Sequence, residues 1–156
     1  MIRVLIVDVS PFICRLLAGH LQTSPEIEVI GTAFNGQRAV DLIHELQPDV
    51  VTLDQEMPEM SGLDSLAQIM TKCPTPVVMI SGVSRRAARL TREALRIGAV
   101  DFVLKYTPGQ DVRPDLLRLE IVSKVKAAAG IKVIRSIATR PMAHALSQVT
   151  QTYLFS

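Results

Sequence analysis

Four polar residues of this chain, Asp8, Asp54, Ser81 and Lys105, each stand where a short run rich in Val, Ile, Leu and Met stops. Two carboxylates, a hydroxyl and an ammonium group in one place would suit transfer of a phosphoryl group onto a carboxylate. Asp54 would be the nucleophile. A divalent cation held by oxygen ligands would neutralise the phosphoryl oxygens. Ser81 and Lys105 would stabilise the phosphoryl group by hydrogen bonding and charge.

These four residues meet only if the runs before them are parallel strands whose carboxyl ends share one edge. Short apolar runs alternate with longer stretches of helical period, which predicts a doubly wound α/β sheet of five parallel strands. Polar and apolar residues alternate from Glu26, as in an edge strand, which favours the flavodoxin-like strand order 2-1-3-4-5. The predicted strands are Arg3–Asp8, Glu26–Gly31, Val50–Asp54, Pro76–Ser81 and Asp101–Lys105.

Start and stop signals delimit the predicted helices. Ser10 followed by Pro11 is typical of an N-cap and a first helical turn, and Pro114 opens the fifth helix. Asn35 precedes the second helix, and Pro48 stops it. For the first helix, the spacing predicts a single apolar face made of Phe12, Leu16, Leu17 and Leu21.

Composition narrows the class of protein. The 156 residues are 48% hydrophobic and carry a formal charge of +2, which fits one well-cored domain and gives no reason to expect a polyanionic partner. Four Phe, two Tyr and no Trp leave little for base stacking, so we do not expect nucleic-acid binding. The apolar runs are too short for a membrane span. Cys14 and Cys73 form no C-x-x-C pair, as in a cytoplasmic protein with reduced thiols.

The strand–helix repeats end near residue 129. Gly130 breaks the fifth helix, so we expect one domain over residues 1–129 and a linker or interaction tail over residues 130–156. Four apolar residues of the tail fall on one helix face, which would pack on the chain itself, on a second copy in a homodimer or on a partner helix. They are Met142, Leu146, Val149 and Tyr153.

Four stretches of sequence carry a family resemblance. They are Val-Leu-Ile-Val-Asp8, Leu53-Asp54-Gln-Glu56-Met57-Pro58, Met79-Ile-Ser81-Gly82 and Gly98-Ala-Val-Asp-Phe102-Val-Leu-Lys105. In this order and with these gaps, they resemble the receiver domain of bacterial two-component response regulators. The sequence of the first 129 residues is most similar to that of the receiver half of chemotaxis protein-glutamate methylesterases.

The resemblance implies a function and a set of site residues. A histidine kinase would phosphorylate the residue that matches Asp54, in phosphorelay signalling related to chemotaxis or motility. Mg²⁺ would be held by Asp8, Asp54 and the backbone carbonyl of Glu56. Ser81 and Phe102 match the switch pair that rearranges on phosphorylation.

Receivers signal through the face formed by the fourth helix, the fifth strand and the fifth helix. Here the fourth helix carries a basic run, which is either a solvated face or an output surface that docks an acidic protein partner. Its members are Arg85, Arg86, Arg89, Arg92 and Arg96.

Two departures from the family pattern fall inside the site. The family has two adjacent acids after the first strand, whereas Asp8 is followed by Val9. Loss of a supporting group around a metal typically costs about 10–100-fold in affinity, so we expect weak Mg²⁺ binding. The family has a proline after the lysine, usually with a cis peptide, and Tyr106 stands there. A trans bond and a reshaped loop are expected, because a cis bond to a non-proline residue costs about 2.5–4 kcal/mol.

These departures leave a second hypothesis open: a phosphate-independent pseudo-receiver that acts as a protein–protein interaction module. A nucleotide- or flavin-binding enzyme would want a G-x-G-x-x-G segment after the first strand, where Val7-Asp8-Val9-Ser10-Pro11 stands instead. The sequence shows no serine nucleophile in a Gly-rich turn with His and Asp partners. We therefore expect no methylesterase activity from this chain.

Overall fold

The computed structural model describes residues 1–57, 60–82, 84–105 and 114–131. All five strands in these ranges are parallel and lie in the order β2-β1-β3-β4-β5, so the predicted flavodoxin-like sheet is confirmed. The strands are β1 (Ile2–Val7), β2 (Ile27–Ala33), β3 (Val50–Asp54), β4 (Val77–Ser81) and β5 (Asp101–Leu104). The helices are α1 (Pro11–Leu21), α2 (Gly36–Leu46), α3 (Gly62–Lys72), α4 (Arg85–Ile97) and α5 (Pro114–Ala129).

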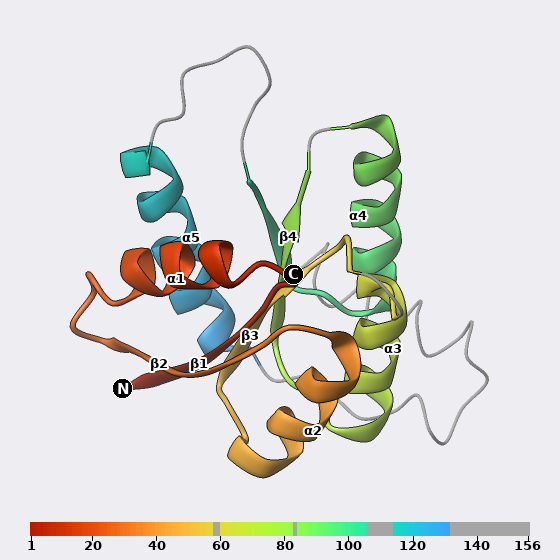
Figure 1. Cartoon of the computed structure of the whole chain (residues 1–156), viewed down its shortest axis with the longest axis horizontal. Coiled ribbons are helices and arrows are strands. Elements are labelled where there is room, and N and C mark those ends of the chain that lie inside the picture. Colours follow the sequence, from red (N-terminus) through yellow and green to blue (C-terminus); the bar gives the residue numbers. More distant parts are fainter. Residues whose placement is uncertain (58–59, 83, 106–113, 132–156) are drawn as a thin grey trace.

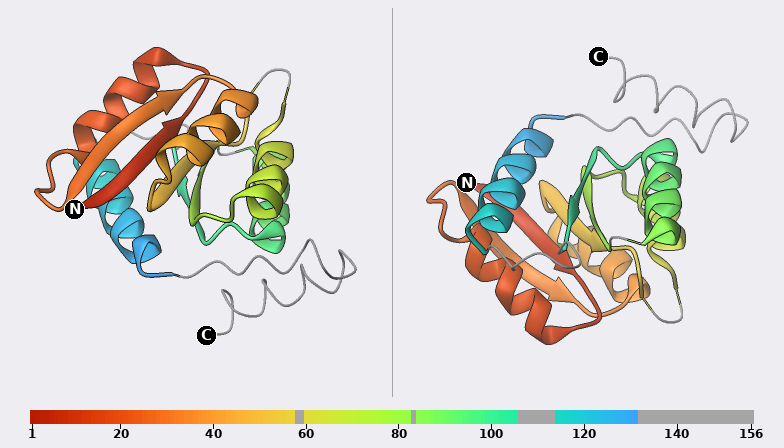
Figure 2. Two further views of the ribbon diagram at one scale, coloured as in Figure 1. Left: turned by 90° about the horizontal axis from the view of Figure 1, so that it is seen from below. Right: turned by 90° about the horizontal axis from the view of Figure 1, so that it is seen from above.

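Helices cover both faces of the sheet, with α1 and α5 on one side and α2, α3 and α4 on the other (Figures 1 and 2). Strand residues alternate between the two cores. Val4 and Ile6 pack with α1 and α5, whereas Leu5 and Val7 pack with the opposite helices. Burial on both faces explains why the strand sequences are continuously apolar.

The edge strand β2 is more exposed than the central strands, as its alternating sequence predicts. It runs from Ile27 to Ala33, so it begins and ends later than predicted. Its register with β1 shifts between Val4 and Leu5, which pair with Val29 and Gly31, and the irregularity accommodates one extra residue in β2.

The start of α1 agrees with the sequence, but its predicted apolar face is wrong in part. Ser10 caps the helix by accepting a hydrogen bond from the Ile13 N–H. Leu17 and Leu21 are buried with Cys14, whereas Phe12 and Leu16 are 64% and 38% exposed. A helix turns about 100° per residue, so a stripe through positions 14, 17 and 21 directs position 12 away from the sheet.

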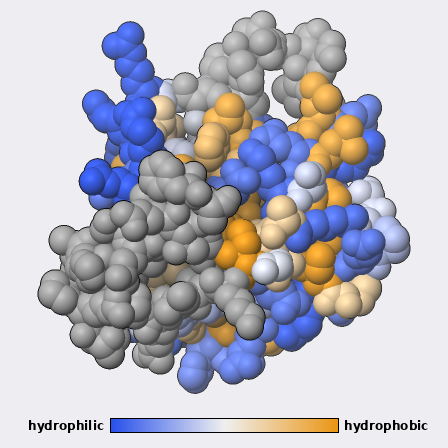
Figure 3. Space-filling model, turned by 180° about the vertical axis from the view of Figure 1, so that it is seen from behind, coloured by the Kyte–Doolittle hydropathy of each residue, from blue (hydrophilic) through white to orange (hydrophobic). Residues whose placement is uncertain are grey.

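On the face seen from behind, the described residues present a mixture of polar and apolar side chains (Figure 3). No helix in the described ranges combines the length and the apolar character needed to span a membrane. Helix α5 ends at Ala129, beside Gly130. Met142, Leu146, Val149 and Tyr153 lie outside the described residues, as does Tyr106, so the division at residue 129 and the trans bond stay predictions.

Candidate functional site

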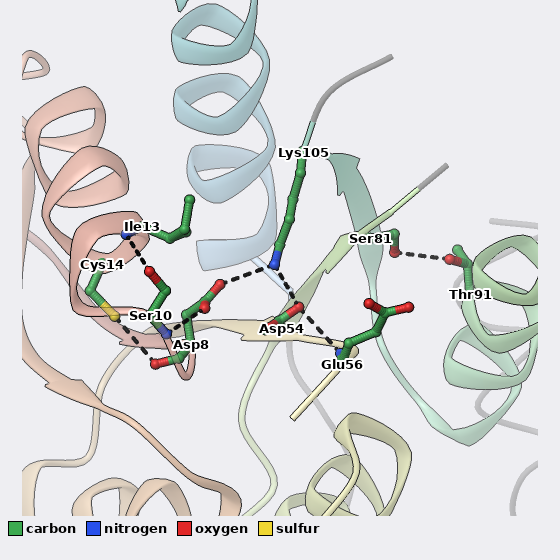
Figure 4. A network of polar contacts seen from close by, with 9 residues as sticks. All are labelled: Asp8, Ser10, Ile13, Cys14, Asp54, Glu56, Ser81, Thr91 and Lys105. Carbon is green, nitrogen blue, oxygen red and sulfur yellow. Dashed lines mark hydrogen bonds and ion pairs between the residues drawn. The ribbon is translucent and has the colours of Figure 1, made fainter. Parts of the chain in front are cut away.

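Three of the four polar strand-end residues lie together at the carboxyl edge of the sheet (Figure 4). Asp54 ends β3, and Asp8 and Lys105 directly follow β1 and β5. The Lys105 Nζ lies 3.0 Å from the Asp54 Oδ1 and 3.3 Å from the Asp8 Oδ2. The Lys105 ammonium group therefore bridges the carboxylates of Asp8 and Asp54, which are 46 positions apart in the sequence.

The local chain fixes both carboxylates. The Asp8 Oδ1 accepts a hydrogen bond of 3.0 Å from the Ser10 N–H, and the Asp54 Oδ1 accepts one of 3.3 Å from the Glu56 N–H. The loop that follows β3 returns closely to this edge at Gly62. A Cβ there would lie 2.6 Å from the Asp54 carbonyl oxygen, so only glycine lets the start of α3 approach the end of β3.

Burial and charge shift the protonation of these groups. Burial raises the pKa of Asp54, and the negative charge of Asp8 adds to that effect, while the hydrogen bond and the charge of Lys105 oppose it. Burial lowers the pKa of Lys105, but the hydrogen bond to Asp54 and the charges of Asp54 and Asp8 outweigh it, so the pKa rises above its usual range. Lys105 is therefore a permanent cation at neutral pH.

The cluster has acceptor capacity to spare. The carboxylates of Asp8 and Asp54 are 1% and 2% exposed, and the Asp8 Oδ2 has no hydrogen-bond partner among the described residues, although Lys105 lies close. With both carboxylates ionised, the cluster carries two negative charges and one positive charge. A buried excess of negative charge favours the uptake of a cation.

The donor set fits a small divalent cation that keeps much of its water. Mg²⁺ is usually held by one or two carboxylates together with phosphate oxygens. Asp8 and Asp54 supply two carboxylates, and the backbone carbonyl of Glu56 follows at the same edge. In the described ranges, no group of three or more His, Cys, Asp or Glu side chains could hold a metal ion. Val9 occupies the position beside Asp8 and is 42% exposed.

The Cys14 thiol borders this cluster without adding to its ligands. Its Sγ donates a hydrogen bond of 3.6 Å to the Asp8 carbonyl oxygen. Burial, with a smaller contribution from the nearby Asp8 charge, raises the pKa of Cys14 to about 11. The thiol therefore stays protonated at neutral pH and is a poor nucleophile and metal ligand.

Ser81 ends β4 at the same edge, but its side chain points toward α4 and away from Asp54 (Figure 4). Its Oγ lies 2.9 Å from the Thr91 Oγ1, and both residues are buried. The Thr91 Oγ1 also accepts a hydrogen bond of 2.9 Å from the Gln55 Nε2. The structure thus separates the Ser81 hydroxyl from the two carboxylates and places it in a neutral network.

Sequence reasoning missed Gln55 and Thr91. The signal for Thr91 was its spacing from Ala87 and Ala94, because all three fall on the buried stripe of α4. A hydroxyl on such a stripe needs a buried partner. Gln55 gave a weaker signal, as a long polar residue directly after an apolar strand.

Phe102 is half-buried on β5, where it pairs with Met79 of β4. The Lys124 Nζ of α5 lies 5.0 Å from the centroid of its ring, which is within cation–π range. The same ammonium donates a hydrogen bond of 2.6 Å to the Phe102 carbonyl oxygen and one of 2.9 Å to the Glu120 carboxylate. Lys124 therefore ties α5 to the strand segment that carries Phe102.

The basic run of α4 is a surface feature. All five of its arginines are exposed, on the side of the helix opposite Ala87, Thr91 and Ala94. Arg96 forms an ion pair of 3.8 Å with Glu93. The arginines are Arg85, Arg86, Arg89, Arg92 and Arg96.

Comparisons with known proteins agree with the geometry. Residues 4–117 match the family described as response regulator receiver domain. The protein-glutamate methylesterase/protein-glutamine glutaminase of Symbiobacterium thermophilum is 48% identical over 129 residues, which cover 83% of this chain and 36% of the relative. The protein of the same description from Agrobacterium fabrum is 47% identical over 146 residues, which cover 94% of this chain and 40% of the relative.

Among solved structures, the response regulator domain of Thermotoga maritima CheB is similar to this chain with a TM-score of 0.74 and 39% identity. The similarity covers 85% of this chain and 98% of that domain. The receiver domain of NtrX from Brucella abortus follows with a TM-score of 0.63 and 31% identity, over 79% of this chain and 98% of that one. The chain thus spans whole receiver domains, but less than half the length of the methylesterase relatives.

Proposed function

Because the chain belongs to the response regulator receiver domain family, we propose that it accepts a phosphoryl group on Asp54 from a histidine kinase. The observation that carries this proposal is the Lys105 ammonium group that bridges the buried carboxylates of Asp8 and Asp54. The similarity to protein-glutamate methylesterases supports phosphorelay signalling related to chemotaxis or motility. We place this activity in the cytoplasm.

The reaction is a transfer between two covalent partners. A carboxylate oxygen of Asp54 attacks the phosphorus, the P–N bond of the kinase phosphohistidine breaks, and the imidazole nitrogen keeps that electron pair. The product is an acyl phosphate on Asp54, and it brings further negative charge to a buried site. Lys105 stabilises this charge because its ammonium group already lies within 3.0 Å of the acceptor carboxylate. Ser81 adds a hydrogen bond to the phosphoryl group.

Asp8, Asp54 and the backbone carbonyl of Glu56 would hold Mg²⁺, which would neutralise the phosphoryl oxygens. Support comes from the spare acceptor capacity of the Asp8 carboxylate. The affinity is weak, because Val9 offers no oxygen where a further carboxylate would assist. We expect it to be about 10–100-fold below that of a site with the extra carboxylate.

The output runs through α4, β5 and α5. Phosphorylation of Asp54 rearranges Ser81 and Phe102, and a downstream acidic protein reads the change on the exposed arginines of α4. Support comes from the charge of that helix, which presents five arginines against one Glu93. The alternative to a partner on this face is a homodimer that forms through the tail of residues 130–156.

A second candidate function is that of a pseudo-receiver, which binds partners without phosphate. One observation favours it: Val9 stands beside Asp8, where the family has a second acid, so the cluster offers no further carboxylate to a metal on this side.

Incubation of the full chain with acetyl phosphate and Mg²⁺, followed by intact mass measurement, tests the proposal. We expect the wild type and Asp64→Asn to gain the mass of one phosphoryl group, because Asp64 is an exposed residue at the start of α3. Asp54→Asn should gain none. A wild type without added mass contradicts the proposal and favours the pseudo-receiver. An Asp54→Asn variant that still gains the mass contradicts the assignment of Asp54 as the acceptor.

A further inference from the structure

We propose that Thr91 is a positioning residue that holds the Ser81 hydroxyl away from Asp54 and thereby links phosphorylation of Asp54 to helix α4. This inference rests on the proposed function, since it concerns how the same site is regulated. It assigns a role to a residue on a different element from those that form the acidic cluster, and it connects the basic helix to Asp54 through the Ser81 hydroxyl.

The count of hydrogens fixes the direction of the bonds. The Thr91 hydroxyl has a single hydrogen, and it donates this to the Ala87 carbonyl oxygen at 2.9 Å. Ser81 and Gln55 must therefore both donate to the Thr91 Oγ1, each at 2.9 Å. The Thr91 oxygen is saturated, and the only hydroxyl proton of Ser81 is committed to it.

The backbone keeps Ser81 beside the acidic cluster while its side chain faces elsewhere. The Gln55 N–H donates to the Ile80 carbonyl oxygen at 3.1 Å, and the Lys105 N–H donates to the Ser81 carbonyl oxygen at 2.9 Å. Ser81 on β4 therefore lies between Lys105 and Gln55, the residue that follows Asp54. A change of its χ1 from one staggered well to another redirects the hydroxyl without moving the strand.

Phosphorylation shifts the balance between the two positions of this hydroxyl. A hydrogen bond to an ionised phosphoryl oxygen is roughly twice as strong as one between neutral groups. Ser81 then leaves Thr91, and Thr91 loses one of its two donors. Thr91 lies on the inner stripe of α4, between the fully buried Ala87 and Ala94. Helix α4, whose outer side carries the arginines, therefore loses a hydrogen bond to β4.

Gln55 supplies the second link, from β3 to the same hydroxyl. It is 3% exposed, and its Oε1 has no hydrogen-bond partner among the described residues. A buried acceptor without a hydrogen-bond partner lowers the stability of the fold. If stability were the only demand on this position, an apolar residue would serve it better than Gln55. The residue is explained if the amide serves to hold Thr91 next to the strand that bears Asp54.

The test measures the rate at which the full chain takes up a phosphoryl group from acetyl phosphate at saturating Mg²⁺. Thr91→Val removes the acceptor while it keeps the shape of the side chain, so Ser81 is released. We expect the rate to rise roughly three- to tenfold, which is the factor that one buried hydrogen bond corresponds to. Thr91→Ser keeps the hydroxyl and should behave as the wild type.

Two further arms separate positioning from packing. In a Ser81→Ala background, Thr91→Val should leave the rate unchanged, because there is no hydroxyl to release. Amide hydrogen exchange of α4 should change on phosphorylation of the wild type and show no such change in Thr91→Val. Circular dichroism verifies folding, and Thr91→Ala replaces Thr91→Val if the valine variant does not fold.

The outcomes are distinct. Equal phosphorylation rates in the wild type and Thr91→Val, or a change that persists in the Ser81→Ala background, overturn the role of Thr91 and leave the proposed function intact. A wild type that takes up no phosphoryl group overturns the proposed function and this role with it.

Discussion

Two buried polar clusters lie at the same edge of the sheet, and they compensate the burial of their polar groups in different ways. The cluster of Asp8, Asp54 and Lys105 is charged, and its two carboxylates share one ammonium group. The cluster of Gln55, Ser81 and Thr91 is neutral, and the central hydroxyl of Thr91 donates once and accepts twice.

Under the proposed function, this difference lets one edge of the sheet carry both a reactive carboxylate and a hydroxyl that is held in reserve. With both carboxylates ionised, the charged cluster keeps an excess of negative charge, and the pKa of Asp54 is raised. Binding of a cation, or neutralisation of a carboxylate, therefore stabilises this cluster. The neutral cluster has little to gain around Thr91, whose bonds are satisfied, and it holds the Ser81 side chain in place. Under the proposed function, the reaction takes place at the first cluster, and the second cluster orients the Ser81 hydroxyl.

The largest effect is expected from removal of the shared cation. Lys105→Met leaves two buried carboxylates without their partner, and we expect the free energy of unfolding at neutral pH to fall by about 3 kcal/mol. The matched control is Lys126→Met, because Lys126 pairs with Glu26 at 3.4 Å on the surface. That change should cost about 1 kcal/mol or less. Urea unfolding of both variants measures the difference, and equal losses would mean that the charged cluster is no better coupled than a surface pair.

A hydroxyl-to-methyl change probes the neutral cluster. Thr91→Val leaves the donors of Ser81 and Gln55 unpaired, and we expect it to cost about 2 kcal/mol in unfolding free energy. Thr52→Val is the control, because the Thr52 Oγ1 is buried without a hydrogen-bond partner among the described residues. It should be neutral or stabilising. Thermal unfolding distinguishes the two, and the same sign for both would remove the distinction between a satisfied and an orphaned hydroxyl.

A carboxylate added beside Asp8 sharpens the charged cluster. Val9→Asp should raise the affinity for Mg²⁺ by at least about tenfold, or 1.4 kcal/mol, because Val9 is partly exposed and adjoins Asp8, which we propose as a Mg²⁺ ligand. Isothermal titration calorimetry measures this affinity, and Val9→Asn controls for polarity without charge. No gain would indicate that the cluster does not bind the ion through this side of Asp8.

The smallest effect is expected from the pH dependence of Asp54, since Lys105 offsets part of the burial cost. A raised pKa means that the folded chain binds this proton more tightly than the unfolded chain. Stability therefore falls as the pH rises from the ordinary value of 3.8 through the raised pKa, and it stays lower above that range. Asp54→Asn should accordingly melt at a higher temperature than the wild type at pH 7, and the advantage should vanish in acid.

The control for this comparison is Asp64→Asn, whose exposed side chain should give no such pH-dependent gain. A melting temperature of Asp54→Asn below that of the wild type at pH 7 would mean that the pairing with Lys105 outweighs burial.

Much of the scaffold was predictable because it depends on patterns along the chain. Continuous apolar runs identified the buried strands, the alternation at Glu26 to Val29 identified the edge strand, and Ser10 with Pro11 located the start of α1. The face of α1 was predicted less well. Phe12 and Leu16 are as apolar as Leu17, and only packing against the sheet and α5 selects among them.

The sequence by itself determined which polar residues reach the carboxyl edge of the sheet, because a parallel sheet brings the carboxyl ends of its strands together whatever their separation along the chain. It identified Asp8, Asp54 and Lys105 in this way. Only the tertiary structure decided where the Ser81 hydroxyl points, and that the Thr91 Oγ1 accepts hydrogen bonds from this hydroxyl and from the Gln55 amide. A short side chain has several staggered directions of similar energy, and a neighbour from another helix is needed to select one of them.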